Sequence, residues 1–544
     1  EVNTMVEIRD IKDAFAEGVE AGWKSVHAGQ LRRDETVSCD VVIVGTGAGG
    51  GTAAEILVQA GLDVVLIEEG PLRTSRDFRL DERTAYRDLY QEGGARASKD
   101  GSITILQGRS VGGSTTVNWT SSFRTPPLTL AQWTDVHGVK GMQKEQMAPW
   151  FERMEQRLKI GTWTVPANAN NDVIRRGCDK LGWSWQGIPR NVEGCWNLGY
   201  CGLGCPTNAK QSMLVTTIPE ALRNGARLYH RARAEKILHD GKRATGVLCL
   251  GMQQDGVTPT GVALTVRARH VVLAGGGINN PGLLLRSDVP DPYRTIGKRT
   301  MLHPVNAVFA RFDEKIEPWS GAPQSLYSDH FQWKDGATGP MGFKIEAIPL
   351  QPGLASSLLG GHGPALSQEM QGLGHINGLI ALCRDGFVED SPGGTVSLRD
   401  DGAPTVDYPL TDALRDGLRR AFLAMAEIQF AAGAKAVRLN QLNLPYFTSW
   451  AQCQQAIKTL PIEKFQTRIG SAHVMGGCAM GEDPARAVTN SNGRFLHLDQ
   501  LSVMDGSLFP TSIGANPQLS IYGMVARLAT MLAAELKPLP VAAR

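Results

Sequence analysis

Two polar side chains in the last 75 residues have the chemistry to act on a hydroxyl group. His473 opens the segment HVMGGCAMG, and Asn516 precedes a proline. A neutral imidazole, whose ordinary pKa is about 6.5, can accept a hydroxyl proton near neutral pH. A carboxamide can hydrogen-bond the same oxygen and fix its orientation. Because an isolated histidine more often packs in a core, this interpretation depends on the surrounding pattern.

Three of the nine cysteines, Cys195, Cys201 and Cys205, lie close together, and a proline follows the last. In this glycine-rich stretch a loop can wrap an inorganic core and donate N–H groups to its sulfurs. Three thiolates suit a three-iron (3Fe-4S) cluster or a four-iron cluster with an open site. The alternatives are a disulfide between two of the three, reduced structural thiols, or a zinc site, which lacks its fourth ligand. The scatter of the other six cysteines argues against a disulfide scaffold.

A nucleotide-binding turn is predicted near the amino terminus. An apolar run ends at Val44 and is followed by Gly45, Gly47 and Gly50 in the pattern G-x-G-x-x-G. The first glycine makes the turn, the second lets a pyrophosphate approach the backbone, and the third packs the helix on the strand. The helix N-terminus then holds the phosphates. Glu68 stands 18 residues after Gly50, at the end of the next apolar run, where its carboxylate can accept both hydrogen bonds of an adenosine ribose.

Two further segments are typical of a cofactor site. Segment 107–119 has two adjacent glycines and then small hydroxyl residues, so its backbone N–H groups can lie against a flat ligand whose edge Asn118 can hydrogen-bond. A short predicted strand ends at Asp505 and Gly506, and a helix is predicted from about 517 to 535.

In this order, the segments resemble the glucose-methanol-choline (GMC) family of FAD-dependent oxidoreductases over most of the chain. The resemblance implies an α/β fold with a Rossmann-like FAD-binding domain and a substrate domain whose antiparallel sheet is backed by helices. It implies that His473 is the active-site base and that Asn516 is its partner. The FAD-binding residues would be Gly45, Gly47, Gly50, Glu68, Gly112, Gly113, Ser114, Asn118, Ala234 near the adenine, Asp505 and Gly506.

The same resemblance divides the chain into parts. The FAD-binding domain would comprise 38–124, 194–302 and 470–544, the substrate domain 125–193 and 303–469, and an N-terminal helical extension 1–37. Apolar or alternating runs at 305–312, 343–348, 376–383, 395–398 and 405–408 predict strands, and a long helix is predicted from its cap at Thr411 to Gly433. A first helix is predicted to open at Asp10, and 353–363 to be a loop that could act as a lid.

The predicted reaction is oxidation of an alcohol to an aldehyde or ketone, with the hydride passing to the flavin. Some family members bind the flavin covalently through a histidine, but none occurs between Tyr90 and Asp135, so noncovalent FAD is expected. The cysteine spacing resembles the cluster loop of cytochrome-linked dehydrogenases in the family, and segment 111–120 resembles the long-chain alcohol oxidases as well. Electrons would then pass through an Fe-S cluster to a cytochrome-type partner. An oxidase that reduces O2, a flavin-dependent lyase and a non-catalytic flavin-binding subunit are the alternatives.

The composition is ordinary for a soluble globular protein. The 544 residues are 42% hydrophobic and 20% charged, with a formal net charge of +2. This balance gives no electrostatic reason to expect nucleic acid or an anionic membrane as a partner. No apolar run of about 18 residues stands out, so no spanning helix is predicted. Localisation stays open: periplasmic or membrane-peripheral if cytochrome-linked, and otherwise cytoplasmic.

Overall fold

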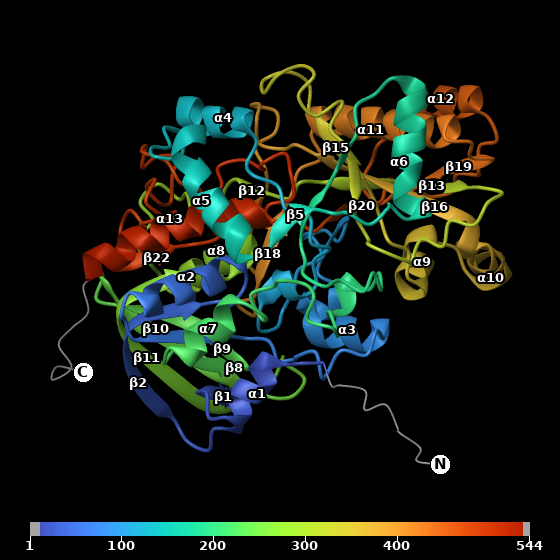
Figure 1. The fold of residues 1–544 in the computed structure, drawn as a ribbon. Coiled ribbons are helices and arrows are strands. Elements are labelled where there is room, and N and C mark those ends of the chain that lie inside the picture. Colours follow the sequence, from blue (N-terminus) through green and yellow to red (C-terminus); the bar gives the residue numbers. More distant parts are fainter. Residues whose placement is uncertain (1–10, 537–544) are drawn as a thin grey trace, which may run out of the picture.

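The computed structural model describes residues 11–536, whose strands form two large sheets lying side by side (Figure 1). The first sheet has the order β1-β8-β3-β2-β11-β10-β9, with β22 added beside β11. Its β1 to β11 portion and β22 are parallel, whereas β10 and β9 return as antiparallel strands. The strands are β1 (Ser25–His27), β2 (Glu35–Val44), β3 (Val64–Glu68), β8 (Arg227–His230), β9 (Ala232–His239), β10 (Ala244–Met252), β11 (Pro259–Leu273) and β22 (Leu501–Val503).

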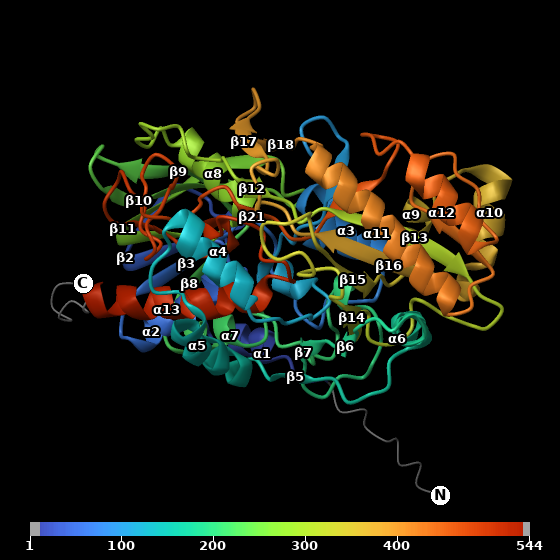
Figure 2. The ribbon, with the colours of Figure 1, turned by 90° about the horizontal axis from the view of Figure 1, so that it is seen from above.

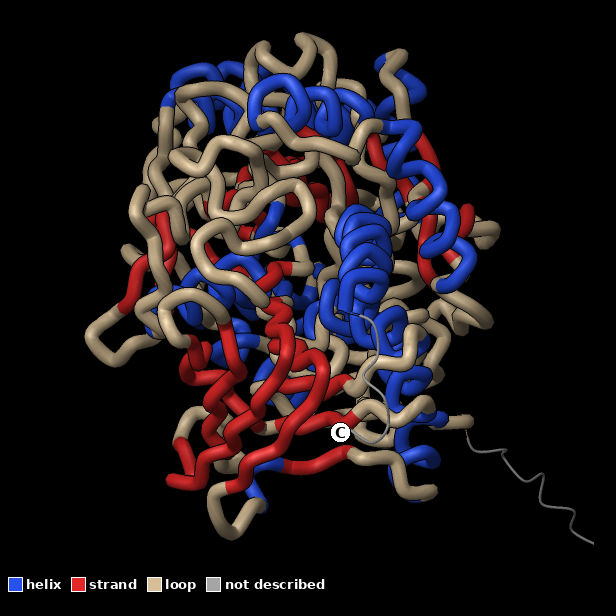
Figure 3. The backbone as a smooth tube through the Cα atoms, turned by 90° about the vertical axis from the view of Figure 1, so that its left-hand side faces the viewer, coloured by secondary structure: helices blue, strands red, loops and turns tan. Residues whose placement is uncertain are grey.

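The central strands of the parallel part are buried on both faces where they approach their C-terminal ends. All of Val41 to Val44 and all of β3 are buried, as expected for strands enclosed between layers. The long C-terminal helix α13 packs against α2 and α5 on one side of this sheet (Figure 2). Figure 3 shows the strands of this sheet twisting across one end of the molecule. The helices around it are α1 (Ala14–Glu20), α2 (Ala48–Gln59), α5 (Lys144–Arg157), α7 (Thr217–Arg223), α8 (Gly276–Arg286) and α13 (Gln518–Leu536).

The second sheet has the order β4-β20-β13-β16-β15-β14-β6, and β19 also pairs with β13. All of its pairs are antiparallel except β4 with β20. Helices α11, α12 and α6 lie along one face, while α9 and α10 lie on the other side (Figure 1). The strands are β4 (Ile103–Ile105), β6 (Gln186–Gly187), β13 (Val305–Arg311), β14 (Leu326–Ser328), β15 (Phe343–Ala347), β16 (Ile376–Cys383), β19 (Ala436–Leu439) and β20 (Ile469–Ser471), and the helices are α6 (Ala169–Leu181), α9 (Pro352–Leu359), α10 (Gly363–Gln371), α11 (Asp412–Ala431) and α12 (Trp450–Thr459).

The remaining elements are short. Two antiparallel pairs, the hairpin of β17 (Thr395–Leu398) with β18 (Pro404–Asp407) and the long-range pair of β12 (Thr300–Met301) with β21 (Met475–Gly476), lie next to α8. β5 (Ile160–Thr162) pairs with β7 (Pro189–Asn191). Helices α3 (Glu82–Leu89) and α4 (Pro127–His137) complete the set of α-helices in residues 11–536.

The predicted fold class is confirmed, and several elements match their predicted bounds closely. Helix α11 begins after Thr411, whose hydroxyl accepts a hydrogen bond from the Leu414 N–H at 3.3 Å. β16 covers the predicted run 376–383. The domain limits given above stay a prediction. Within them, β4 comes from the predicted FAD-binding segment 38–124 but pairs into the second sheet, and β1 comes from the predicted N-terminal extension but pairs into the first sheet.

Two predictions about local structure are wrong. The first helix begins at Ala14, because the Asp13 side chain caps it through the Ala16 N–H; Asp10 lies outside the described residues. Segment 353–363 is mostly helical: α9 occupies most of it, and three glycines with positive φ, Gly360, Gly361 and Gly363, turn the chain into α10.

Among the described residues, α13 is the one helix long and apolar enough to cross a membrane, and 56% of that stretch is buried inside the protein.

Candidate active site

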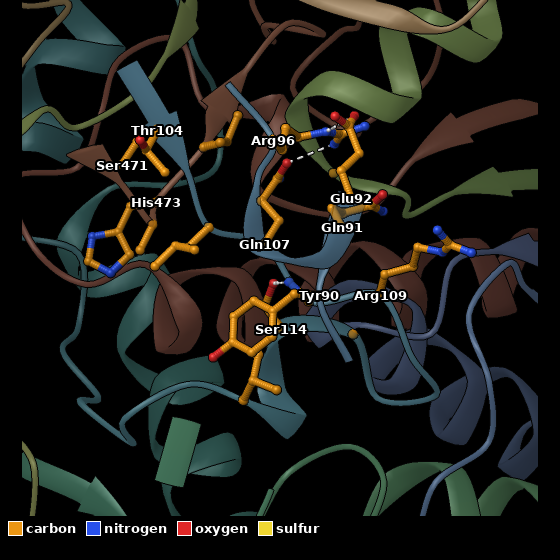
Figure 4. A pocket seen from close by; sticks show the side chains of 18 of the residues that line it. Tyr90, Gln91, Glu92, Arg96, Thr104, Gln107, Arg109, Ser114, Ser471 and His473 are labelled. Atoms are coloured by element: carbon orange, nitrogen blue, oxygen red, sulfur yellow. Dashed lines mark hydrogen bonds and ion pairs between the residues drawn. The ribbon is translucent and has the colours of Figure 1, made fainter. Parts of the chain in front are cut away.

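A cavity of about 1630 Å³ is lined by residues from both large sheets. Most of the predicted site residues line it, although they come from distant parts of the chain. Figure 4 shows His473 on one side of this space and Arg96, Gln107 and Arg109 on another. The predicted residues that line it are Gly45, Gly47, Glu68, Gly113, Ser114, Asn118, Ala234, His473, Asp505, Gly506 and Asn516. Gly50 and Gly112 do not line it and lie behind the wall.

The first glycine turn is packed too tightly for side chains. Gly45 has φ +105°, and a Cβ there would lie 2.3 Å from the Ala274 carbonyl oxygen. A Cβ on Gly50 would lie 1.9 Å from the Gly45 oxygen, so this glycine permits α2 to approach the strand. Gly47 caps α2 without a side-chain hydrogen bond. The helix therefore presents free N–H groups to the cavity, which suits a pyrophosphate.

Glu68 ends β3 at the cavity wall. Its Oε2 accepts hydrogen bonds from the Thr46 hydroxyl at 2.6 Å and the Thr46 N–H at 3.2 Å, and its Oε1 accepts one from the Gly70 N–H at 2.9 Å. Burial raises the pKa of this carboxyl to about 7. Because a carboxylate has lone pairs beyond these three bonds, it can still accept from ribose hydroxyls.

The second glycine pair lies directly against the first turn. Gly113 has φ +54°, and a Cβ there would lie 2.6 Å from the Gly47 Cα. The Gly112 N–H donates to the Thr46 hydroxyl at 3.1 Å. Further along, the Asn118 side chain donates to the Gln518 side-chain oxygen at 2.8 Å. These contacts leave a smooth backbone wall that a flat ring system can approach.

Asp505 joins the C-terminal segment to the start of α8. One carboxylate oxygen accepts from the Gly276 N–H at 2.7 Å and the Asn280 side chain at 2.9 Å, and the other accepts from the Ser507 N–H at 2.9 Å. Burial raises the pKa of Asp505. The two segments that the sequence placed 225 residues apart thus form one edge of the cavity.

His473 lines the cavity and contacts a second histidine, His303, which the sequence did not indicate as a site residue. The two Nδ1 atoms are 3.0 Å apart. His303 is fully buried and has φ +49°, and its backbone N–H donates to Asp385 at 3.2 Å. Burial, with a smaller effect of the Lys344 charge, lowers the pKa of His473 to about 3. Burial also lowers the pKa of His303 well below its ordinary value, with His473 and Lys344 adding to the effect. Both rings are therefore neutral near pH 7.

Asn516 reaches the same cavity from the loop before α13. Its amide nitrogen donates to Glu346 at 3.1 Å, and its oxygen accepts from Lys344 at 3.3 Å. Neither charged residue was selected from the sequence, because alternating polar positions in a strand usually face solvent.

The three clustered cysteines lie in one loop and are half-buried free thiols. Among residues 11–536, no group of three or more His, Cys, Asp or Glu side chains is placed to hold a metal ion. Lys210 ties this loop to the cavity wall: its ammonium donates to the carbonyls of Thr116, Asn118 and Cys201 at 2.6, 2.9 and 2.8 Å. The Tyr90 hydroxyl also reaches the loop, donating to the Gly202 carbonyl at 2.7 Å.

Thiol acidity differs along the loop. Burial raises the pKa of Cys201. At Cys205 burial has the same tendency, but hydrogen bonds from Thr207 and the Lys210 backbone, together with the Lys210 charge, lower the pKa overall. Of these two thiols, Cys205 therefore ionises more readily.

Two family models described as GMC oxidoreductase match residues 86–305 and 390–525. An uncharacterised GMC-type oxidoreductase of Mycobacterium tuberculosis is 32% identical over 91% of this chain and 76% of its own length. A long-chain-alcohol oxidase of Arabidopsis thaliana is 29% identical over 92% of this chain and 68% of its own. Among solved structures, a formate oxidase of Aspergillus oryzae studied for its FAD modification has a TM-score of 0.69 at 16% identity, covering 92% of this chain and 99% of the other.

Proposed function

Because this chain belongs to the GMC oxidoreductase family, an FAD-dependent family acting on CH–OH groups, we propose that it oxidises an alcohol with His473 as the base. The observation that carries the proposal is the 3.0 Å contact between the Nδ1 atoms of His473 and His303 at the cavity wall. One proton must lie between these two atoms. When His473 supplies it, the Nε2 of His473 keeps its lone pair and can accept a proton.

The chain's own groups then divide the work. His473 takes the hydroxyl proton, and the Asn516 amide donates a hydrogen bond to the same oxygen, which holds the carbinol carbon in one orientation. Bound FAD supplies the hydride acceptor. Gly47 and Gly113 would pass close to its phosphates and ring, and Glu68 would hold its ribose. We propose that FAD is bound noncovalently.

Two routes for the electrons remain. The sequence favours an Fe-S cluster at Cys195, Cys201 and Cys205 that passes them to a cytochrome-type acceptor. Its support is the cysteine spacing and the contacts of Tyr90 and Lys210, which join that loop to the cavity wall. Against it, the thiols are not placed as a ligand set. The relatives named as oxidases favour the second route, reduction of O2 to H2O2.

One experiment tests the activity and separates these routes. A panel of alcohols is mixed anaerobically with the yellow protein, and bleaching of the flavin is followed; turnover is then compared with O2 and with an artificial dye. Bleaching by at least one alcohol is expected. If no alcohol bleaches the flavin, a lyase or a non-catalytic flavin-binding subunit becomes the better description.

The cluster has its own measurement. Iron and acid-labile sulfide are counted per flavin on anaerobically purified protein, with EPR after oxidation. About three irons per flavin are expected for a 3Fe-4S cluster. Absence of both elements together with rapid turnover on O2 establishes the oxidase route.

A further inference from the structure

Two opposite charges lie on the cavity-facing side of the second sheet. β15 carries Lys344 and Glu346, which pair in register with Leu382 and Ile380 of β16. The neighbouring positions of β13 on this face are Val305 and Ala307. The side chains of Lys344 and Glu346 are only 3% and 0% exposed. A buried ion pair among aliphatic neighbours is seldom there for stability, because desolvation offsets its attraction.

The pair is enclosed on its far side by aromatic rings. The Lys344 ammonium is 2.9 Å from the ring centre of Phe123 and 4.3 Å from that of Tyr327. Its Nζ is 3.3 Å from Glu346 Oε1, although that oxygen accepts no hydrogen bond. The amide of Asn516, which is 5% exposed, contacts both members of the pair. Glu346 and Asn516 both line the cavity, whereas Lys344 and the two rings lie behind them.

Chemistry fixes which way this amide points. An ammonium can only donate hydrogen bonds and a carboxylate can only accept them. The Asn516 oxygen therefore must face Lys344, at 3.3 Å, and its nitrogen must face Glu346, at 3.1 Å. One N–H of the amide is used by Glu346, and the other N–H stays available. A flipped amide would set two donors against each other and two acceptors against each other.

We propose that Lys344 and Glu346 are positioning residues that hold Asn516 with its free N–H toward the substrate oxygen. This inference rests on the proposed alcohol oxidation. As the hydroxyl proton leaves, negative charge develops on that oxygen, and an N–H stabilises it whereas an amide oxygen would repel it. The ion pair acts on the substrate oxygen through Asn516.

A double-mutant cycle tests this. Lys344→Met/Glu346→Leu removes both charges at similar volume, and it is made with Asn516 intact and with Asn516→Ala. The limiting rate of anaerobic flavin reduction by the best alcohol is measured. With Asn516 intact, we expect a loss of about 10- to 100-fold, the usual worth of one hydrogen bond to a charged group. In the Asn516→Ala background, the same change should cost less than about twofold, because coupled residues are not additive. Equal losses in the two backgrounds would overturn the proposal.

Two further variants guard against a folding defect. Glu346→Gln keeps an acceptor oxygen for the Asn516 nitrogen and should therefore retain most of the wild-type rate of flavin reduction. Asn516→Asp/Glu346→Gln exchanges amide and carboxylate, which preserves the net charge and the hydrogen bonds but leaves no N–H at the cavity. This exchange should bind flavin, seen by its absorbance, and reduce it as slowly as Asn516→Ala. Wild-type rates in it would refute the role of the N–H.

A matched control removes another ion pair from the same domain. Arg311→Met/Glu369→Leu deletes the pair between β13 and α10, which does not touch Asn516. It should leave flavin reduction within about twofold of wild type. If the wild type is not bleached by any alcohol, the proposed function fails; if it is bleached but the losses are additive, only the role of Lys344 and Glu346 fails.

Discussion

The Nδ1 atoms of His303 and His473 face each other at 3.0 Å, deep in the wall of the cavity. Since a neutral imidazole carries one proton, only one of these atoms can be the donor. If His303 donates, His473 carries its proton on Nε2 and cannot act as a base there. If His473 donates, its Nε2 is free and the proton of His303 lies on Nε2, which has no hydrogen-bond partner in the described structure. The tautomer of His473 is therefore coupled to that of His303.

His303 variants should separate hydrogen bonding from packing. The residue has φ +49°, a conformation that Asn and Gly tolerate better than other residues. His303→Asn can offer an oxygen to the Nδ1 proton of His473 and should keep flavin reduction within about tenfold of wild type. His303→Gly should lose about 100-fold and recover in part when imidazole is added. If His303→Asn is no faster than His303→Gly, tautomer selection is not the role of this residue.

His473→Ala should retain the flavin but slow its anaerobic reduction by about 10²- to 10⁴-fold, the usual contribution of a general base. Stopped-flow bleaching with the best alcohol measures this. His330, which stacks on Trp183 away from the cavity, is the control: His330→Ala should change the rate by less than about twofold. An unchanged rate in His473→Ala would remove the residue from the base role.

Asn516→Ala should cost less than His473→Ala, because it removes one hydrogen bond, worth about 1–3 kcal/mol, to the reacting oxygen. The same bleaching assay reports it, together with the alcohol concentration that gives half the limiting rate. If Asn516→Ala is silent while His473→Ala is inactive, the two residues do not share the substrate oxygen.

The pH dependence should differ from that of a free histidine. Burial, with help from Lys344, lowers the pKa of His473 to about 3, so its neutral, proton-accepting form persists as pH falls through 6.5. We expect the limiting rate of flavin reduction to stay level from about pH 8 to about pH 5. Lys344→Met removes a like charge, so it should raise the pKa of His473 and move the acid limb to higher pH. A tenfold fall per pH unit beginning near 6.5 in the wild type would contradict this.

The flavin should be released by acid. No histidine lies between Tyr90 and Asp135 to attach it. Trichloroacetic acid should therefore leave a colourless pellet and free FAD in the supernatant, identified by its chromatographic retention. Yellow colour that stays with the precipitated protein would show a covalent bond.

The features that the sequence determined are those set by neighbours along the chain. The glycine turn at Gly45, the acid at the end of β3 and the cap at Thr411 each depend on residues within one or two elements, so their spacing is visible in the sequence. β16 could be bounded because a mostly apolar run of this length indicates a buried strand. The motifs around His473 and Asn516 pointed to one cavity, and both residues line it.

Tertiary structure decided the partners of those residues. His303 lies 170 residues before His473, and Lys344 lies 172 residues before Asn516, so no local pattern links them. β15 alternates charged and apolar residues, which predicts a strand with a solvent face, yet all five of its residues are buried. That second face is covered by Asn516 and aromatic rings from other segments. The way the two sheets pack against each other decides which of these polar groups meet. The tautomers of the two histidines and the orientation of the Asn516 amide depend on those contacts, so no short stretch of the chain predicts them.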